Sequence, residues 1–268
     1  MTAFFHHLAY DFKTGIRDRS KLLMYYLFPL VFFALVGGVM ASINPGFKQT
    51  MIPAMVLFAF MCSALLSLPG LLVDAREAGV FRSYRINGVP AASIISIPVI
   101  GTAVHMAVVA LIITLAGMRL FGGTAPVHVV GFAAAALLTY AAYAGIGVLI
   151  GVAAGNSTVS TLVAQLVYIP SIILGGLMFP TSFLPAGLQR VALLLPATHS
   201  MRVFTGLGMP GSESVPWLSI GVLAAFVIFS FGLSALIFEW DSRASVPSRK
   251  AWAALLGIVP FAAAVLFL

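Results

Sequence analysis

The residues with the most polar chemistry lie in one short loop. Segment 74–90 reads DAREAGVFRSYRINGVP and carries several charged side chains, in a chain whose charged fraction is only 8%. This density of charge between two apolar stretches predicts a helix in water that ends at Gly88-Val89-Pro90. Its charged side chains could pair with a partner protein, or they could only fix the orientation of the neighbouring stretches in a membrane.

Three polar side chains inside apolar stretches are candidates for lining a transport pathway. Burying a polar side chain in lipid is costly, so such residues are functional candidates by default. We select His105, Gln165 and Tyr168, the last two about one helical turn apart. Hydrogen bonding between helices is the alternative for each of them. No Asp or Glu interrupts these stretches, which weighs against a proton- or sodium-coupled transporter.

Three prolines interrupt the apolar segment that follows Gly175. Pro180, Pro185 and Pro196 divide it into pieces shorter than the roughly 20 residues that a membrane-crossing helix needs. Broken helices at membrane depth occur only where protein or a water-filled cavity covers their free backbone groups. The sequence therefore predicts a re-entrant pair of outer helices over 180–210. This pair could gate a pathway, or it could only pack against the outer ends of its neighbours.

Composition predicts an all-α, polytopic membrane protein. The 268 residues are 61% hydrophobic with a mean hydropathy of +1.10, which excludes an ordinary soluble domain. The net charge of +7 is spread in short clusters between apolar stretches, the pattern that orients membrane proteins rather than one that binds nucleic acid. No phosphate-binding loop, zinc motif or nucleophile elbow occurs, so we expect no enzyme, no bound cofactor and no metal.

Six apolar stretches are long enough to cross a bilayer. The predicted spans are Leu22–Ser42, Met51–Val73, Ser93–Met118, Pro126–Ala154, Val159–Phe179 and Trp217–Phe238. A linker at 239–250 precedes a seventh apolar segment, Ala251–Leu268, which could span, half-insert or lie at the interface. Gly147, Gly151 and Gly155 repeat at the spacing of close helix packing, within one chain or at a dimer seam.

Basic residues predict the orientation. Ten Lys or Arg residues precede the first span or follow the second and sixth spans, against four on the opposite side. The amino terminus and loop 74–92 are therefore predicted to be cytoplasmic, and the broken helices external. Residues 1–21 predict an amphipathic helix in the cytoplasmic interface, with Phe4, Phe5, Leu8, Phe12 and Ile16 on its apolar arc.

The order of these features resembles the ABC type-2 permease family, the membrane subunits of ATP-driven exporters. The resemblance covers about residues 1–240 and rests on the leader helix, the span spacing, the loop 74–92 and the segment GGLMFPTSFLPAGLQRVALLLPATHSMRVF. The turn Asp18-Arg19-Ser20 before Tyr26-Leu27-Phe28-Pro29 is similar to the drug and antibiotic branch. The family core commonly ends after the sixth span, so the tail departs from the pattern.

The resemblance implies partners and roles. A separate ATP-binding-cassette ATPase would carry ATP and Mg, and a second permease copy would complete the pathway within membrane lipid. The loop would dock on that ATPase, with Glu77, Arg82 and Arg85 pairing with it and Phe81 and Tyr84 as apolar anchors. Such a transporter would export an amphipathic drug, antibiotic or lipid-like compound across the cytoplasmic membrane. A secondary, ion-coupled transporter acting without an ATPase is the alternative.

Overall fold

The computed structural model describes residues 2–44, 46–211, 214–240 and 259–265, and the described part is helical without strands. In chain order the elements are α1 (Thr2–Gly15), α2 (Arg19–Leu22), η1 (Leu23–Leu27), α3 (Phe28–Ile43), α4 (Phe47–Met61), η2 (Cys62–Ser67), α5 (Leu68–Glu77), α6 (Val80–Ile86), α7 (Ala91–Leu120), α8 (Val129–Ala153), α9 (Ser157–Leu174), η3 (Thr181–Phe183), α10 (Ala186–Ala192), α11 (Pro196–Gly208), α12 (Trp217–Ile237) and α14 (Val259–Val265).

The predicted number of spans is confirmed: six helices in the described part are long and apolar enough to cross a membrane. The first joins α2, η1 and α3, and the second joins α4, η2 and α5. The fifth was expected to reach Phe179, but α9 ends at Leu174 because Gly175 and Gly176 follow, the latter with φ of +84°. A left-handed backbone of this kind suits glycine and stops a helix.

Prolines explain a local widening in the first two spans. Each holds a π-helical turn, η1 and η2, that ends just before Pro29 or Pro69. Proline lacks the N–H that would complete a helical hydrogen bond, and its ring collides with the carbonyl one turn earlier. A π turn accommodates both effects without breaking the helix. The two turns are neighbours, and Ser67 Oγ lies 3.5 Å from the Tyr25 hydroxyl.

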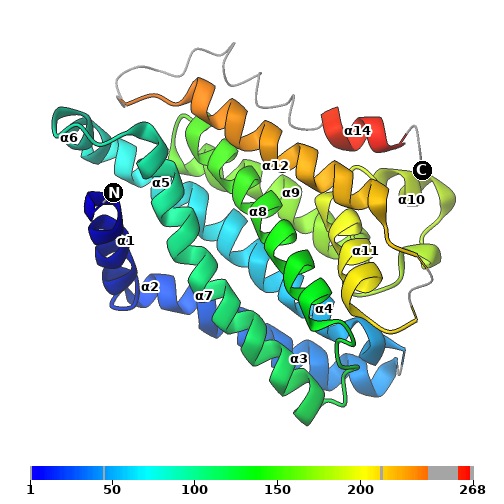
Figure 1. Ribbon diagram of the computed structural model, residues 1–268. Helices are drawn as coiled ribbons and strands as arrows, with labels where there is room; N and C mark the ends of the chain where they lie inside the picture. Colours follow the sequence, from blue (N-terminus) through cyan, green and yellow to red (C-terminus); the bar gives the residue numbers. More distant parts are fainter. Residues whose placement is uncertain (1, 45, 212–213, 241–258, 266–268) are drawn as a thin grey trace.

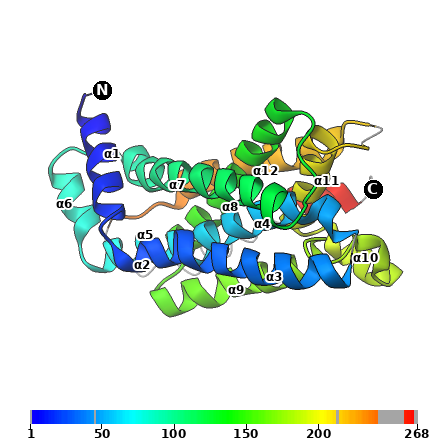
Figure 2. The ribbon, with the colours of Figure 1, turned by 90° about the horizontal axis from the view of Figure 1, so that it is seen from below.

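The long helices run side by side, and α1 and α6 lie at one end of the bundle while α10 lies at the other (Figure 1). In the view from below, α1 crosses the end of this bundle instead of running along it (Figure 2). Helix α1 ends at Gly15, earlier than the predicted boundary at residue 21, because Asp18 starts the first span. The Asp18 carboxylate accepts hydrogen bonds from the backbone N–H groups of Ser20 and Lys21, the usual N-cap arrangement.

Two members of the predicted apolar arc of residues 1–21 have different surroundings in the structure. Ile16 is 47% exposed, whereas Phe12 stacks on His105 of α7 with ring centroids 4.7 Å apart. The polar side chains of His7 and Asp11 line a cavity on the inner side. Helix α1 therefore turns polar groups as well as aromatic rings toward the bundle.

The broken segment divides into an exposed and a buried half. Helix α10 is exposed along most of its length, with Leu188 at 41% and Val191 at 44%. Helix α11 is almost fully buried and packs against α4, α8, α9 and α12. The predicted pair of short helices is present, but only its second member enters the protein interior.

Glycines allow α8 to approach the second span closely. A Cβ atom at Gly147 would lie 2.0 Å from the carbonyl oxygen of Ala64, and one at Gly151 would lie 3.0 Å from that of Pro69. Nothing lies within 4 Å of such an atom at Gly155. The repeat at 147 and 151 therefore packs within the chain, which settles the two alternatives for these glycines.

Most of the tail lies outside the described residues: the linker at 241–250 and the segments 251–258 and 266–268. Within α14, Phe261 is 3% exposed and packs on Phe226 of α12 with ring centroids 4.8 Å apart. The described part of the seventh apolar segment is therefore attached to the sixth span.

Candidate functional site

The loop between the second and third spans forms a short helix with a charged outer face. Gly79, with φ of +74°, turns the chain out of α5, and α6 begins at the next residue. Arg82 and Arg85 are exposed, as is Glu77 at the end of α5. Ile86 is 79% exposed beside them. An apolar side chain ringed by charges has the composition of a protein-docking surface, and the sequence analysis had not selected Ile86.

The inner face of α6 is occupied by the two aromatic side chains expected to meet a partner. Phe81 is 4% exposed and packs on Phe238, which follows α12, with ring centroids 5.5 Å apart. This corrects the expectation for Phe81, whose ring anchors α6 to its own chain. Residues 81 and 84 are three apart on a helix and so share one face, and Tyr84 accordingly turns inward as well.

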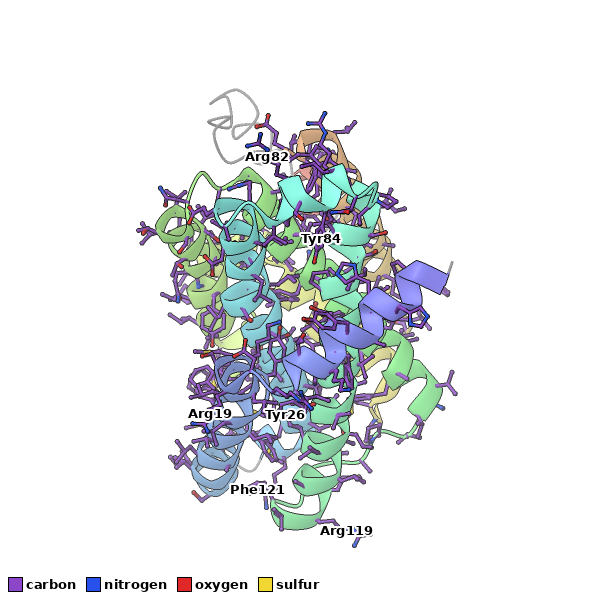
Figure 3. All side chains as sticks on the ribbon, turned by 90° about the vertical axis from the view of Figure 1, so that its left-hand side faces the viewer. Arg19, Tyr26, Arg82, Tyr84, Arg119 and Phe121 are labelled. Atoms are coloured by element: carbon purple, nitrogen blue, oxygen red, sulfur yellow. The ribbon has the colours of Figure 1, made fainter. Side chains whose placement is uncertain are left out.

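Tyr84 joins α6 to α1. Its hydroxyl lies 3.2 Å from Nε2 of His7, and the two rings meet edge to face at 5.2 Å. Burial raises the pKa of the Tyr84 phenol, and the Asp11 carboxylate of α1 raises it further. Figure 3 shows Tyr84 and Tyr26 on opposite sides of α1. The leader helix and the loop helix therefore form one connected unit at this end of the protein.

Arg76 is the residue of this region that sequence reasoning did not select. It is 5% exposed, and its guanidinium donates hydrogen bonds to the carbonyl oxygens of Val152, at 3.0 Å, and Ala154. The last carbonyl groups of a helix have no hydrogen-bond partner within it. A cation at this C-terminal end also interacts favourably with the partial negative charge of the helix dipole. Arg76 thus fastens the end of α5 to the end of α8.

His105 lies on α7 against the leader helix and the first span. Its Nδ1 is 2.8 Å from the Tyr26 hydroxyl, and Phe12 covers the ring. A Cβ atom at Gly15 would lie 3.6 Å from its Nε2, so the end of α1 packs directly on this ring. These contacts fit the interhelical alternative for His105.

Gln165 and Tyr168 lie elsewhere, on α9. The Tyr168 hydroxyl is 3.4 Å from Cys62 Sγ in η2, and its ring approaches Phe58. Gln165 is half-buried and has no side-chain hydrogen bond to another described residue. The structure therefore does not bring His105 together with the α9 pair, and a pathway role for the three residues stays a prediction.

An apolar groove of about 530 Å³ separates α7 from α8. Alanine and methionine side chains form much of its lining, with Phe60, Phe132 and Tyr140 as the aromatic walls. None of the three predicted pathway residues lines this groove. The groove exists because several of the facing side chains of α7 and α8 are small alanines. Sequence reasoning missed it because no single residue identifies a groove of this kind.

The three prolines stand where the short helices begin. Pro180 and Pro185 precede η3 and α10, and Pro196 is the first residue of α11. Proline suits these positions because it has no N–H to leave unsatisfied in a first helical turn. The predicted breaks are thus present, while a gating role stays a prediction.

Buried His199 holds the broken segment in place. Its Nε2 is 2.9 Å from the Leu193 carbonyl oxygen and its Nδ1 is 3.2 Å from Ser219 Oγ of α12. Burial lowers the pKa of His199; the hydrogen bond to the Leu193 carbonyl acts against this shift, and the charge of Arg202 adds to it. Sequence reasoning missed this residue, because a histidine beside Thr198 and Ser200 gives no motif.

Comparison with known proteins identifies the family. The family model described as "ABC-2 type transporter" matches residues 2–209. The chain is also 30% identical over 104 residues to nodulation protein J of Rhizobium leguminosarum bv. viciae, a match that covers 38% of this chain and 39% of that protein. With its six candidate spans, the chain belongs to the ABC-2 type transporter family and is a multi-pass membrane permease.

Proposed function

We propose that this permease is the membrane subunit of an ATP-driven exporter whose ATPase is a separate polypeptide. The observation that carries this proposal is the outer face of α6, where Arg82, Arg85 and Ile86 are exposed beside Glu77. The same helix is tied inward to α1 through Tyr84 and to the region after α12 through Phe81. An ATPase bound to this outer face of α6 could transmit its conformational change to the helical bundle through these inward contacts.

The second proposed partner is another copy of this chain or a related permease. A membrane-crossing helix that packs against its own chain along only one face leaves its other, apolar face for lipid or for another subunit. The windows of the first and fifth spans are each only 22% buried, and α3 and α9 lie along the same side of the bundle in Figure 2. Their outer faces supply the surface on which we place the second copy.

The proposed substrate is an amphipathic drug, antibiotic or lipid-like compound. Support comes from the groove between α7 and α8, which is lined almost entirely by apolar side chains. Ligand sites of this kind bind an apolar body and use a few polar groups to orient it. In this groove Thr114 and the hydroxyl-bearing Tyr140 are the polar members.

The test is purification of the permease together with a co-expressed candidate ABC ATPase, followed by native mass spectrometry and ATP hydrolysis in vesicles. We expect a complex of two permeases with two ATPases, hydrolysis that rises when an amphipathic substrate is added, and ATP-dependent movement of that compound. Transport by the permease alone, driven by an ion gradient without ATP, would establish the secondary transporter instead.

We also propose that the end carrying α1 and α6 faces the cytoplasm. Seven of the ten basic residues counted for that side are described, and they belong to α1, α2, α5 and α6 or the turn before α2; the remaining three, Arg243, Arg249 and Lys250, lie outside the described residues. In Figure 3, Arg82 and Arg119 lie at opposite ends of the molecule. An excess of Lys and Arg marks the cytoplasmic side.

Single cysteines test this orientation in a Cys62→Ala background. In intact cells, an impermeant thiol reagent should label Ser214→Cys and leave Ser83→Cys unlabelled, since these exposed positions lie at opposite ends of the bundle. Opening the cells should make Ser83→Cys reactive, which controls for accessibility. Labelling of Ser83→Cys alone from outside would reverse the orientation.

A further inference from the structure

The cavity between α1, α6 and α7 contains a carboxylate that the chain leaves unpaired. Its volume is about 210 Å³, the share of roughly seven liquid waters at about 30 Å³ each. Asp11 lines it, and the backbone carbonyl of this residue accepts a hydrogen bond from the Thr14 hydroxyl. No described residue pairs with the carboxylate itself, and a half-buried carboxylate of this kind favours a cationic ligand.

A glycine on α7 makes room for this carboxylate. A Cβ atom at Gly101 would lie 2.9 Å from Asp11 Oδ2, closer than real side chains tolerate. The carboxylate therefore rests against the bare backbone of α7 at the cavity wall. A side chain at this position would displace it.

The cavity also holds one cation and several uncharged donors. Lys21 lines it but forms no ion pair with Asp11, so the two charges do not neutralise each other. The rest of its polar lining consists of the hydroxyl groups of Tyr25, Tyr84, Ser93 and Thr102 and the imidazoles of His7 and His105. Among the described residues no group of three His, Cys, Asp or Glu side chains could hold a metal ion. The site thus offers one negative and one positive group among hydroxyl and imidazole side chains.

We propose that this cavity binds a zwitterionic phosphoethanolamine group, with its primary ammonium on Asp11 and its phosphate toward Lys21. A primary ammonium donates up to about three hydrogen bonds, which a carboxylate and phenol oxygens accept, and a phosphate suits the ammonium of Lys21. The source we favour is the headgroup of an aminophospholipid, because α1 crosses the bundle end where an amphipathic helix meets lipid headgroups. This site goes beyond the proposed export function and does not depend on an ATPase.

The test uses the full chain purified in detergent with equal amounts of phosphatidylethanolamine and phosphatidylcholine, followed by native mass spectrometry. We expect the ethanolamine lipid to be retained about tenfold over the choline lipid, because choline cannot donate the charge-assisted hydrogen bond. Asp11→Asn should bring the ratio close to one. Asp74→Asn, an exposed acid at the same end of the protein, is the matched control and should keep the preference.

A glycine pair separates loss of the site from loss of the fold. Gly101→Ala should lower the preference by shifting the Asp11 carboxylate, whereas Gly70→Ala should not, since nothing lies within 4 Å of its added methyl group. Soluble phosphoethanolamine distinguishes the source: displacement of the retained lipid, or its own Asp11-dependent binding, shows that the headgroup alone suffices. Equal retention of both lipids by the unmodified chain without any effect of phosphoethanolamine, or a preference that persists in Asp11→Asn, would overturn the proposal.

Discussion

Reversing the two arginines on the outer face of α6, in the double variant Arg82→Glu, Arg85→Glu, is expected to reduce ATP-driven transport and substrate-stimulated ATP hydrolysis at least about tenfold. Loss of one partner in a desolvated charge pair costs about 2–5 kcal/mol, and about 1.4 kcal/mol already corresponds to a tenfold change in binding. Both side chains are exposed and make no hydrogen bond with another described residue. Membrane insertion and thermal stability should therefore stay unchanged.

The matched control places the same charge change at the other end of the bundle. Arg119→Glu with Arg190→Glu alters two exposed arginines there and should leave ATP hydrolysis unaffected. Ile86→Ser tests the apolar part of the same surface, since an exposed isoleucine contributes little to the chain's own stability. If the α6 double variant purifies with the ATPase at the normal ratio and transports at the normal rate, this surface has no part in coupling.

Replacing Gly147 with alanine is expected to destabilise the helical bundle by about 3 kcal/mol, the upper part of the range for overpacked interiors. The added methyl carbon would lie 2.0 Å from the Ala64 carbonyl oxygen, and a backbone atom cannot move aside as a flexible side chain can. The whole of α8 would have to withdraw from η2. Thermal unfolding of the purified chain in detergent measures the loss.

Gly155→Ala is the control for that experiment. It belongs to the same repeat, yet nothing lies within 4 Å of the added methyl group, so the unfolding temperature should not fall. Equal stability of the Gly147→Ala variant and the unmodified chain would show that α8 and the second span are farther apart in the membrane than in this structure.

The sequence predicted the six spans and the starts of the short helices because both depend on local properties. Hydropathy over about 20 residues identifies a span without any knowledge of its neighbours, and Pro185 or Pro196 starts a helix wherever the chain goes next. The ends of α1 and α9 were less well placed. The end of α1 depends on Asp18, which caps the next helix, and the end of α9 depends on the backbone turn at Gly175 and Gly176. The effects of such residues reach only one or two positions along the chain.

The contacts between distant segments could not be predicted in this way. Phe81 was expected, from the family resemblance, to be an apolar anchor for the ATPase, and a seven-residue helix has too few positions to show which of its sides the chain itself covers. Its contact, Phe238, lies in another part of the sequence. Arg76 was counted only as one of the ten basic residues that predict the orientation, because the carbonyl groups that it binds, those of Val152 and Ala154, lie far away in the sequence.

The hydrogen bonds of Arg76 to the end of α8 determine which helices would move together with α6. A force on that short helix reaches α5 through the turn at Gly79, and there Arg76 connects it to the end of α8. Helix α8 packs along α12 and against buried α11 near the opposite end of the bundle. A continuous set of packed helices therefore runs across the protein through α5 and α8, and in the proposed transporter a displacement of α6 would be passed along it to α11.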